Sequence, residues 1–331
     1  MGFESINPES IKLAYNRVKP YINPTPLLQS TQLNNWLGHE VIFKIEALQK
    51  VGAFKIRGAT NTILSLKEQE KMPDAVVAFS SGNHAQAVAL AASLFGIKST
   101  VFMAKTSSKI KVQATRSYGA EVIITEDRKE AEARVKDIEN DGAYFIHPFD
   151  NDMVIAGQGT ACYEAFETGI KPSAIFATCG GGGLLSGTYL AKELCSPDSL
   201  VFAGEPANAN DAASSYNSGQ ILSFENSPKS IADGALTLAV SPRTFHYLQK
   251  LNGFYEIAED EIIYWTQWLT YLLKISLEPT SAVAMAAAFK WLQTQKQKQQ
   301  ILVILSGGNI APETQRIIWE NDYLGKIPAI G

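Results

Sequence analysis

The sequence predicts an α/β fold in which parallel strands are buried between layers of helices. Short runs of β-branched and apolar residues alternate along most of the chain with segments whose apolar positions recur every three or four residues. The runs are largely apolar, as expected for strands that are covered on both faces. Repeated alternation of these two element types is typical of parallel sheets in a layered α/β architecture. The predicted strands are 41–46, 76–80, 99–104, 121–125, 174–179, 200–205 and 301–306.

Composition and charge narrow the class of protein. With 331 residues the chain is long enough for two domains, each with its own core, and its 46% apolar and 19% charged residues indicate a globular protein. A net charge of −4 gives no electrostatic footprint for a nucleic-acid partner. Three cysteines without paired spacing argue against a disulfide framework or a zinc site. Because no signal peptide or membrane-length apolar run is visible, we expect a cytoplasmic protein that does not associate with membranes.

Lys55 is the first unusual residue along the chain. It lies in the run VGAFKIRGAT, residues 51–60, whose other members are mostly small or apolar. A lysine in such a run commonly buries its stem and directs its ammonium to solvent. A desolvated lysine instead has a lowered pKa, keeps some neutral amine near neutral pH and can form a Schiff base with a carbonyl. The residue alone leaves both interpretations open.

The loop FSSGNHAQA follows the predicted strand 76–80. Gly82 makes a turn, and a helix is expected to begin near Asn83 and to end at Gly96. The backbone donors at the start of a helix, with hydroxyl and amide side chains beside them, suit a small carboxylate. Ordinary helix capping would use the same residue types. His84 is expected to be a structural hydrogen-bond donor.

Four consecutive glycines, 180–183, follow the predicted strand 174–179. Glycine lets backbone N–H groups converge, and a helix that begins near Leu184 adds partial positive charge, so this loop is predicted to bind a phosphate. A Walker A loop would need Lys where Thr188 stands, and a dinucleotide loop would need Gly or Ala where Ser186 stands. The pattern therefore favours a phosphate ester other than a nucleoside triphosphate or NAD.

A third loop, VILSGGNIAP, follows the strand 301–306. Ser306 stands at the carboxyl end of that strand, where its hydroxyl can hydrogen-bond a ring nitrogen without imposing a charge. An ordinary turn would use the same letters, so this loop carries little information alone.

Together these features resemble the fold-type II, tryptophan-synthase-β-like family of pyridoxal 5′-phosphate enzymes, within it the serine/threonine dehydratase and serine racemase branch. The resemblance implies a two-domain, three-layer parallel-sheet fold. A small mobile domain would span 49–148, and a large cofactor-binding domain would span 1–48 and 149–331. The matching stretches are NPTPLLQS, GAFKIRGA, SSGNHAQA, HPFDN, IAGQGT, CGGGGLLSG, GEPANAND, IADG, EPTSA and LSGGN, in the family's order and over nearly the whole chain.

The resemblance also implies a role for each motif. Lys55 would be the catalytic lysine that binds the cofactor covalently, and Ser81 matches the second acid/base of serine racemases. Phe54 would pack beside the cofactor ring, and Ser306 would face its ring nitrogen. The implied carboxylate site is Ser81, Gly82, Asn83 and His84. The implied cofactor contacts are Phe54, Lys55, Asn83, Gly180, Gly181, Gly182, Gly183, Leu184 and Ser306.

The stretch GEPANAND resembles the divalent-cation site of the same branch. The implied ligands are the carboxylates of Glu205 and Asp211 and the backbone carbonyl of Ala209. Oxygen ligands of this kind suit Mg²⁺, Mn²⁺ or Ca²⁺. Without the resemblance these acidic residues would be interpreted as part of a solvated loop.

The activity implied is α,β-elimination of the β-hydroxyl from L-threonine or L-serine, which gives a 2-oxo acid and ammonia. Two alternatives use the same chemistry: a serine racemase with elimination as a side activity, and a 3-hydroxyaspartate dehydratase. An alternative from a different class is a catalytically silent ligand-binding protein on the same fold. A homodimer or higher homo-oligomer is expected from the resemblance alone.

Overall fold

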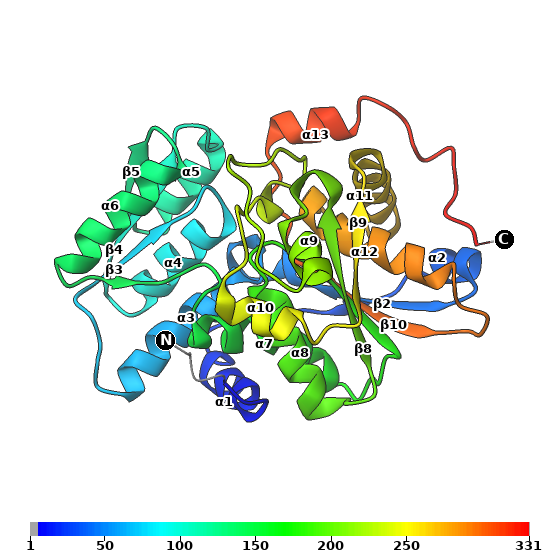
Figure 1. The fold of residues 1–331 in the computed structure, drawn as a ribbon, viewed down its shortest axis with the longest axis horizontal. Helices are drawn as coiled ribbons and strands as arrows, with labels where there is room; N and C mark the ends of the chain where they lie inside the picture. Colours follow the sequence, from blue (N-terminus) through cyan, green and yellow to red (C-terminus); the bar gives the residue numbers. More distant parts are fainter. Residues whose placement is uncertain (1–5, 331) are drawn as a thin grey trace.

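The computed structural model describes residues 6–330 and forms two lobes, each built around one sheet (Figure 1). The larger lobe holds a six-stranded sheet in the order β1-β2-β10-β7-β8-β9, and the smaller lobe holds a four-stranded sheet in the order β5-β4-β3-β6. The prediction that no signal peptide is present rests partly on residues 1–5, which lie outside the described residues. The strands are β1 (Leu27–Leu28), β2 (Glu40–Ile45), β3 (Ala75–Phe79), β4 (Lys98–Ala104), β5 (Glu121–Thr125), β6 (Tyr144–Phe145), β7 (Ala174–Thr178), β8 (Leu200–Pro206), β9 (Gly253–Ile257) and β10 (Gln300–Leu305).

Helices cover both faces of both sheets, so the prediction of a layered α/β fold is confirmed. The α-helices are α1 (Glu9–Val18), α2 (Thr31–Leu37), α3 (Lys55–Glu68), α4 (Asn83–Leu94), α5 (Lys109–Ser117), α6 (Arg128–Asn140), α7 (Asp152–Phe166), α8 (Gly183–Cys195), α9 (Asp211–Ser218), α10 (Pro242–Leu248), α11 (Glu259–Leu273), α12 (Pro279–Leu292) and α13 (Pro312–Ile318). Short 3₁₀ helices lie at Glu46–Leu48, Lys50–Gly52, Ala207–Ala209 and Asp233–Ala235.

The six-stranded sheet is apolar on both faces because successive residues of its central strands enter different cores. In β10, Val303 packs in the core formed with α2, α11 and α12, whereas Leu302 and Ile304 pack in the core formed with α1, α7 and α8. From β2 to β9 the neighbouring strands run parallel. The two-residue strand β1 pairs antiparallel with β2 at the sheet edge, so the sheet is not parallel throughout.

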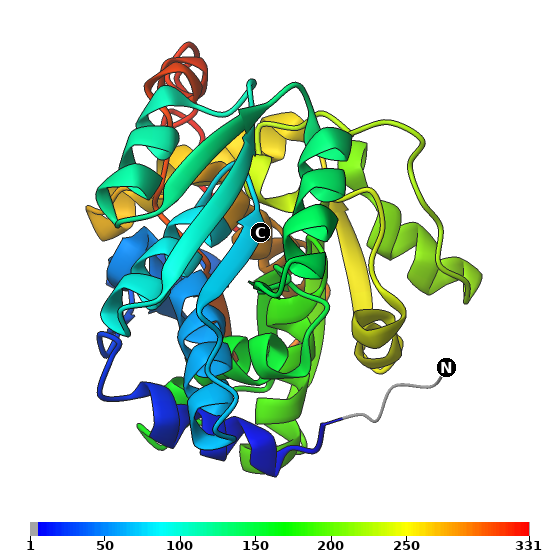
Figure 2. The same ribbon diagram turned by 90° about the vertical axis from the view of Figure 1, so that its left-hand side faces the viewer.

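The four-stranded sheet of the smaller lobe is parallel and is covered in the same way. Val77 and Phe102 pack against α6, while Val101 and Met103 pack against α4 and α5. Figure 2 looks at this lobe, with its strands side by side and a helix beside them. The loop before α4 follows the carboxyl end of β3, and this places the loop at the boundary between the lobes.

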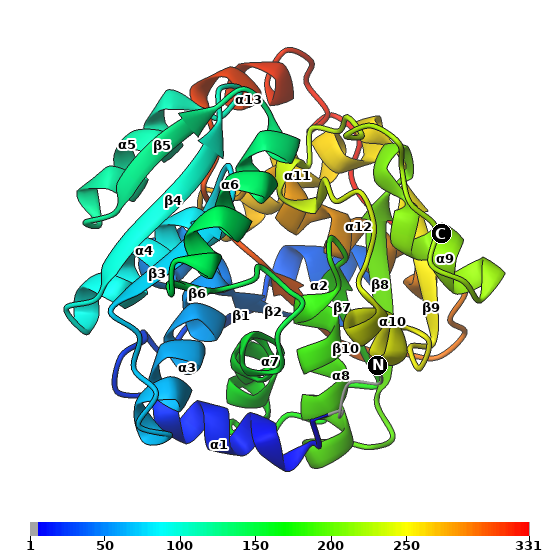
Figure 3. The ribbon, with the colours of Figure 1, turned by 60° about the vertical axis from the view of Figure 1, so that its left-hand side comes forward.

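Helix α7 lies between α3, which begins at the predicted lysine, and α8, which begins at the last residue of the glycine loop (Figure 3). Glycines make these crossings very close. A Cβ atom at Gly157 of α7 would lie 2.6 Å from the backbone oxygen of Arg57 in α3, and one at Gly187 of α8 would lie 2.4 Å from the backbone nitrogen of Gly159 in α7. Backbone therefore contacts backbone, and the spacing of the three helices is tightly defined.

Each of the seven strands predicted from the sequence is present, with ends that differ by no more than one residue. The helix predicted from Asn83 begins there and ends at Leu94, two residues before Gly96. The sequence analysis missed β9, whose central residues are only half-buried, and the two-residue strands β1 and β6. The domain division at residues 49 and 148 stays a prediction.

Candidate active site

A cleft of about 1080 Å³ lies between the two lobes and is lined by residues from both. Its walls include the ends of β3, β7 and β10, where parallel strands present their following loops. Every residue predicted to contact the cofactor or the substrate carboxylate lines this cleft. They are Phe54, Lys55, Ser81, Gly82, Asn83, His84, Gly180, Gly181, Gly182, Gly183, Leu184 and Ser306.

Lys55 is the first residue of α3, and it is half-buried where it borders the cleft. Its Nζ donates a hydrogen bond to the backbone oxygen of Pro148 at 2.9 Å and lies 5.1 Å from the centre of the Phe54 ring. Burial lowers the pKa of the Lys55 amine to about 8, although the carboxylate of Glu278 opposes this shift. A substantial neutral fraction near pH 7 to 8 is what a nucleophilic lysine requires.

The glycine loop joins the end of β7 to α8, as the sequence predicted. Gly182 has φ of +85°, a conformation that favours glycine, and a Cβ atom there would lie 2.9 Å from Cδ1 of Leu248. A Cβ atom at Gly181 would lie 2.1 Å from the Phe149 ring. Only glycine fits these two positions, and the 13-residue helix α8 begins directly after them. The loop therefore has the form of a phosphate-binding cradle.

The loop before α4 places an exposed Ser81 in the cleft beside the half-buried Gly82 and Asn83. The amide nitrogen of Asn83 donates to both oxygens of Glu278, at 3.1 and 2.9 Å, and its amide oxygen accepts from Nδ2 of Asn309 at 2.9 Å. The polar atoms of the Asn83 side chain are thus already partnered by residues of the larger lobe.

His84 is buried in the first turn of α4, and its Nε2 lies 2.7 Å from the backbone oxygen of Ile146. A carbonyl can only accept, so Nε2 carries the proton and Nδ1 does not. Burial, with a smaller contribution from Lys55, lowers the pKa of His84 to about 3. The ring is therefore neutral and acts as a structural donor, as we expected, while Nδ1 has no hydrogen-bond partner.

Ser306 follows β10 and is almost completely buried. Its Oγ lies 3.3 Å from Oγ of Ser281, which also donates to the backbone oxygen of Gly307 at 2.7 Å. The backbone oxygen of Ser306 accepts from the N–H of Phe54 at 3.1 Å, which brings the third loop against the lysine segment. The groups that contact Ser306 in this way are neutral.

Two charged features of the cleft were missed by the sequence analysis. Glu278, inside the stretch EPTSA, is buried, and its burial raises the pKa of its carboxyl to about 7. Lys111 of α5 pairs across the lobes with Asp233, with Nζ and Oδ2 2.5 Å apart. Glu278 precedes Pro279 at the start of α12, so in the sequence it looks like a helix-start residue.

The predicted cation ligands form a separate cluster that does not line the cleft. The carboxylate of Glu205 lies at the start of α9 and accepts hydrogen bonds from the backbone N–H groups of Ala212 and Ala213 at 3.1 and 2.7 Å. Burial raises the pKa of Glu205 well above its ordinary value and that of Asp211 to about 7, and Oδ2 of Asp211 is buried without a partner. Carboxylate and carbonyl oxygens are ligand types that divalent cations accept. Within residues 6–330 no group of three or more His, Cys, Asp or Glu side chains could hold a metal ion.

The chain is similar to known enzymes over most of its length. Residues 18–307 match the family described as pyridoxal-phosphate dependent enzyme. The sequence is 40% identical over 302 residues to an L-threo-3-hydroxyaspartate ammonia-lyase of Saccharomyces cerevisiae (90% of this chain, 91% of that protein). It is 39% identical over 305 residues to a serine racemase of Schizosaccharomyces pombe (91% of this chain, 94% of that protein). The structure resembles the crystal structure of a T.th. threonine deaminase with a TM-score of 0.86 at 38% identity (93% of this chain, 99% of that chain).

A helix that spans a bilayer has to be both long and apolar. None of the helices within residues 6–330 meets both requirements.

Proposed function

The chain belongs to the pyridoxal-phosphate-dependent enzyme family, and from this premise we propose that it is an ammonia-lyase that converts L-threonine and L-serine into a 2-oxo acid and ammonia. The observation that carries the proposal is the shared cleft, which is lined both by Lys55, whose amine has a lowered pKa, and by a four-glycine loop at a helix start. A catalytically silent binding protein is set aside, because the similar proteins are enzymes and both features are intact.

The residues of the cleft would hold the cofactor as follows. Glycines 180–183 and the start of α8 would bind its phosphate, Lys55 would bind it covalently, and Ser306 would offer a neutral hydroxyl to its ring nitrogen. When bound, pyridoxal phosphate supplies an electron sink for the bond that breaks at the substrate α-carbon. The neutral amine of Lys55 is the base available to remove the α-proton.

The loop before α4 would hold the substrate carboxylate. The first N–H groups of a helix have no partner within the helix, so those of Asn83 and His84 are available to an anion. The His84 ring would not donate to that carboxylate, because its proton is committed to Ile146. The hydroxyl of Ser81 is exposed in the cleft and could add a further donor. The β-hydroxyl of the substrate must gain a proton and leave as water.

A second candidate substrate is 3-hydroxyaspartate, which carries a second carboxylate. Lys111 and Arg128 both line the cleft, and two cations there favour a dicarboxylic amino acid over a neutral one. Lys111 is already paired with Asp233, and Nη1 of Arg128 donates to the backbone oxygen of Leu236 at 3.2 Å. A second substrate carboxylate would have to compete with these partners.

The test is to incubate the cofactor-loaded protein, in the presence of Mg²⁺, with L-serine, L-threonine and L-threo-3-hydroxyaspartate separately. Release of 2-oxo acid and formation of D-serine are followed in the same samples. Oxo acid from serine and threonine without D-serine supports the proposal, whereas predominant turnover of 3-hydroxyaspartate supports the second candidate. Abundant D-serine would instead assign a racemase. Lys55→Ala should abolish all three activities and still unfold cooperatively.

A further inference from the structure

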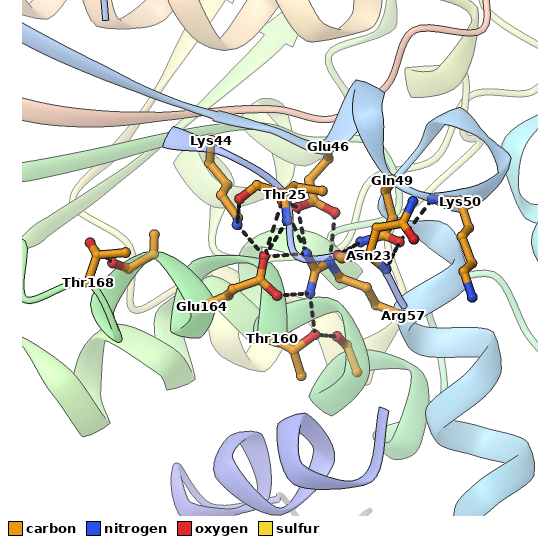
Figure 4. Close-up of polar contacts among 12 residues, drawn as sticks. Asn23, Thr25, Lys44, Glu46, Gln49, Lys50, Arg57, Thr160, Glu164 and Thr168 are labelled. Carbon is orange, nitrogen blue, oxygen red and sulfur yellow. Dashed lines mark hydrogen bonds and ion pairs between the residues drawn. The ribbon is translucent and has the colours of Figure 1, made fainter. Parts of the chain in front are cut away.

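Arg57, two residues after the predicted catalytic lysine, is the centre of a buried ion network (Figure 4). Its guanidinium donates to Glu46 through Nε and Nη2 at 2.7 and 2.8 Å, and to Glu164 through Nη2 and Nη1 at 3.0 and 3.3 Å. Nζ of Lys44 donates to Glu164 at 2.5 Å and to the backbone oxygen of Thr25 at 2.7 Å. We call the group Thr25, Lys44, Glu46, Arg57 and Glu164 the Arg57 network.

The charges of the Arg57 network balance, with two carboxylates facing two cations. Arg57 and Glu46 have no exposed side-chain surface, and Lys44 has 1%. Burial lowers the pKa of Arg57, but the two carboxylates outweigh it and raise that pKa above its already high value, so the guanidinium stays charged. A buried ion network is weak evidence for stability, since apolar residues of equal volume often serve as well. Its distinctive property is a fixed, bidentate geometry.

The Arg57 network fixes one end of the short segment that contains Lys55. On one side of Lys55, Ala53 pairs with Gly307 and the N–H of Phe54 donates to Ser306, so the chain is attached to the end of β10. On the other side, Arg57 is attached to Glu46 directly after β2 and to Glu164 of α7. Strands β2 and β10 are paired neighbours in the six-stranded sheet.

The start of α3 is also held in place by contact with α7. A Cβ atom at Gly58 would lie 2.9 Å from the backbone oxygen of Val154, so the two backbones meet one residue beyond Arg57. Helix α7 in turn contacts α8, which begins at the glycine loop. The lysine segment is therefore linked to the phosphate-binding loop through elements of the larger lobe, while Ile56, Ala59 and Ile63 of α3 also pack against β3 and α4 of the smaller lobe.

We infer that Arg57 is a positioning residue: the Arg57 network fixes the first turn of α3 to the larger lobe, so that the Lys55 amine keeps its place relative to the glycine loop. The inference rests on the proposed function in assigning Lys55 to the cofactor. It differs from the predicted small mobile domain of residues 49–148, because it places Lys55 and the first turn of α3 with the larger lobe, so that Lys55 stays with the glycine loop if the smaller lobe moves. The network contributes no group to the reaction.

The test removes the attachment while it keeps the charges balanced. In Arg57→Met/Glu46→Met, Lys44 and Glu164 remain as a neutral pair. The matched control is Arg17→Met/Glu68→Met, which removes a half-exposed ion pair at the other end of α3. Each full-length protein is stripped of cofactor, and the rate at which pyridoxal phosphate becomes attached to Lys55 is followed between pH 6 and 10 by absorbance and by borohydride trapping.

We expect the network variant to unfold cooperatively but to attach pyridoxal phosphate about 10- to 100-fold more slowly, because small displacements of a reacting group have effects of this size. The pH midpoint of attachment should rise from about 8 towards 10.5, since a displaced Lys55 amine is better solvated. After reconstitution kcat should fall by a similar factor while KM changes less than about threefold. The control pair should change none of these values.

Unchanged attachment rates and an unchanged midpoint in the network variant would overturn the inference. If that variant fails to fold, Arg57→Lys decides, because it keeps the charge but loses the bidentate fork. Attachment at the wild-type rate in Arg57→Lys would equally overturn the inference, and slowed attachment would support it. Attachment by the wild-type protein without lyase activity would contradict only the proposed substrates. No attachment at Lys55 in the wild type would overturn both proposals.

Discussion

Two regions of the larger lobe each bury a pair of carboxylates, but only one of them places cationic side chains against the pair. In the Arg57 network, burial raises the pKa of Glu164, but Arg57 and Lys44 outweigh burial and lower it. In the cluster of Glu205 and Asp211, burial raises both pKa values, and among the described residues neither carboxylate makes an ion pair. Burial alone therefore does not distinguish a structural cluster from a candidate binding site, whereas the balance of charge does.

The largest effect is expected when one cation is removed from the charge-balanced Arg57 network. Arg57→Ala would leave Glu46 and Glu164 facing only Lys44, and one unpaired carboxylate buried in an apolar environment costs roughly 3–5 kcal/mol of folding free energy. We expect a correspondingly lower urea midpoint with an unchanged m-value. The control Arg17→Ala, in a pair that is part-exposed, should cost about 1 kcal/mol or less. Equal losses in the two variants would contradict the contrast between buried and exposed pairs.

A smaller effect on stability is expected when a cation supplies positive charge to the cluster of Glu205 and Asp211. We propose that a divalent cation binds Glu205, Asp211 and the carbonyl of Ala209, so Mg²⁺ at 100 times its Kd should stabilise the protein by about 2.7 kcal/mol. The melting temperature with Mg²⁺ and with EDTA measures this. Asp211→Asn should abolish the Mg²⁺ response and leave the metal-free protein no less stable. A Mg²⁺ response that survives in Asp211→Asn would place the ion elsewhere.

The third prediction concerns Glu278, a single buried carboxylate in the cleft. Its folded pKa of about 7 lies above the ordinary value of 4.5, so the native state holds the proton more tightly than the unfolded chain. Stability from this group is therefore fully present below pH 4.5 and is lost as pH rises through 7, by roughly 3 kcal/mol in total, of which about 2 kcal/mol falls between pH 5 and pH 7.5. In the cofactor-free protein, urea unfolding at pH 5 and pH 7.5 should show this difference, and Glu278→Gln should show a smaller one. A variant with the same pH dependence as the wild type would assign the effect to another group.

Much of the fold and part of the candidate site could be predicted because their signals are local. The strands are continuous apolar runs, the glycine loop is four adjacent letters, and Lys55 is conspicuous among small and apolar neighbours. The polar partners could not be predicted in this way. Arg57 and Glu164 are 107 positions apart, and Asn83 and Glu278 are 195 apart, so no pattern in either segment indicates the pairing. β9 was missed because it begins with Gly253 and has no buried, β-branched centre.

The close packing of helix α7 determines how slowly its backbone amides become exposed to water. Its residues from Val154 to Phe166 are buried, and its glycines put its backbone against α3 and α8 with no side chain between them. Water can reach these amides only when the helices separate, and their separation would dismantle the larger lobe's core. The amide hydrogens of α7 should therefore exchange with deuterium among the slowest in the protein, at a rate set by global unfolding. The half-exposed β9 should exchange through smaller openings, long before α7 does.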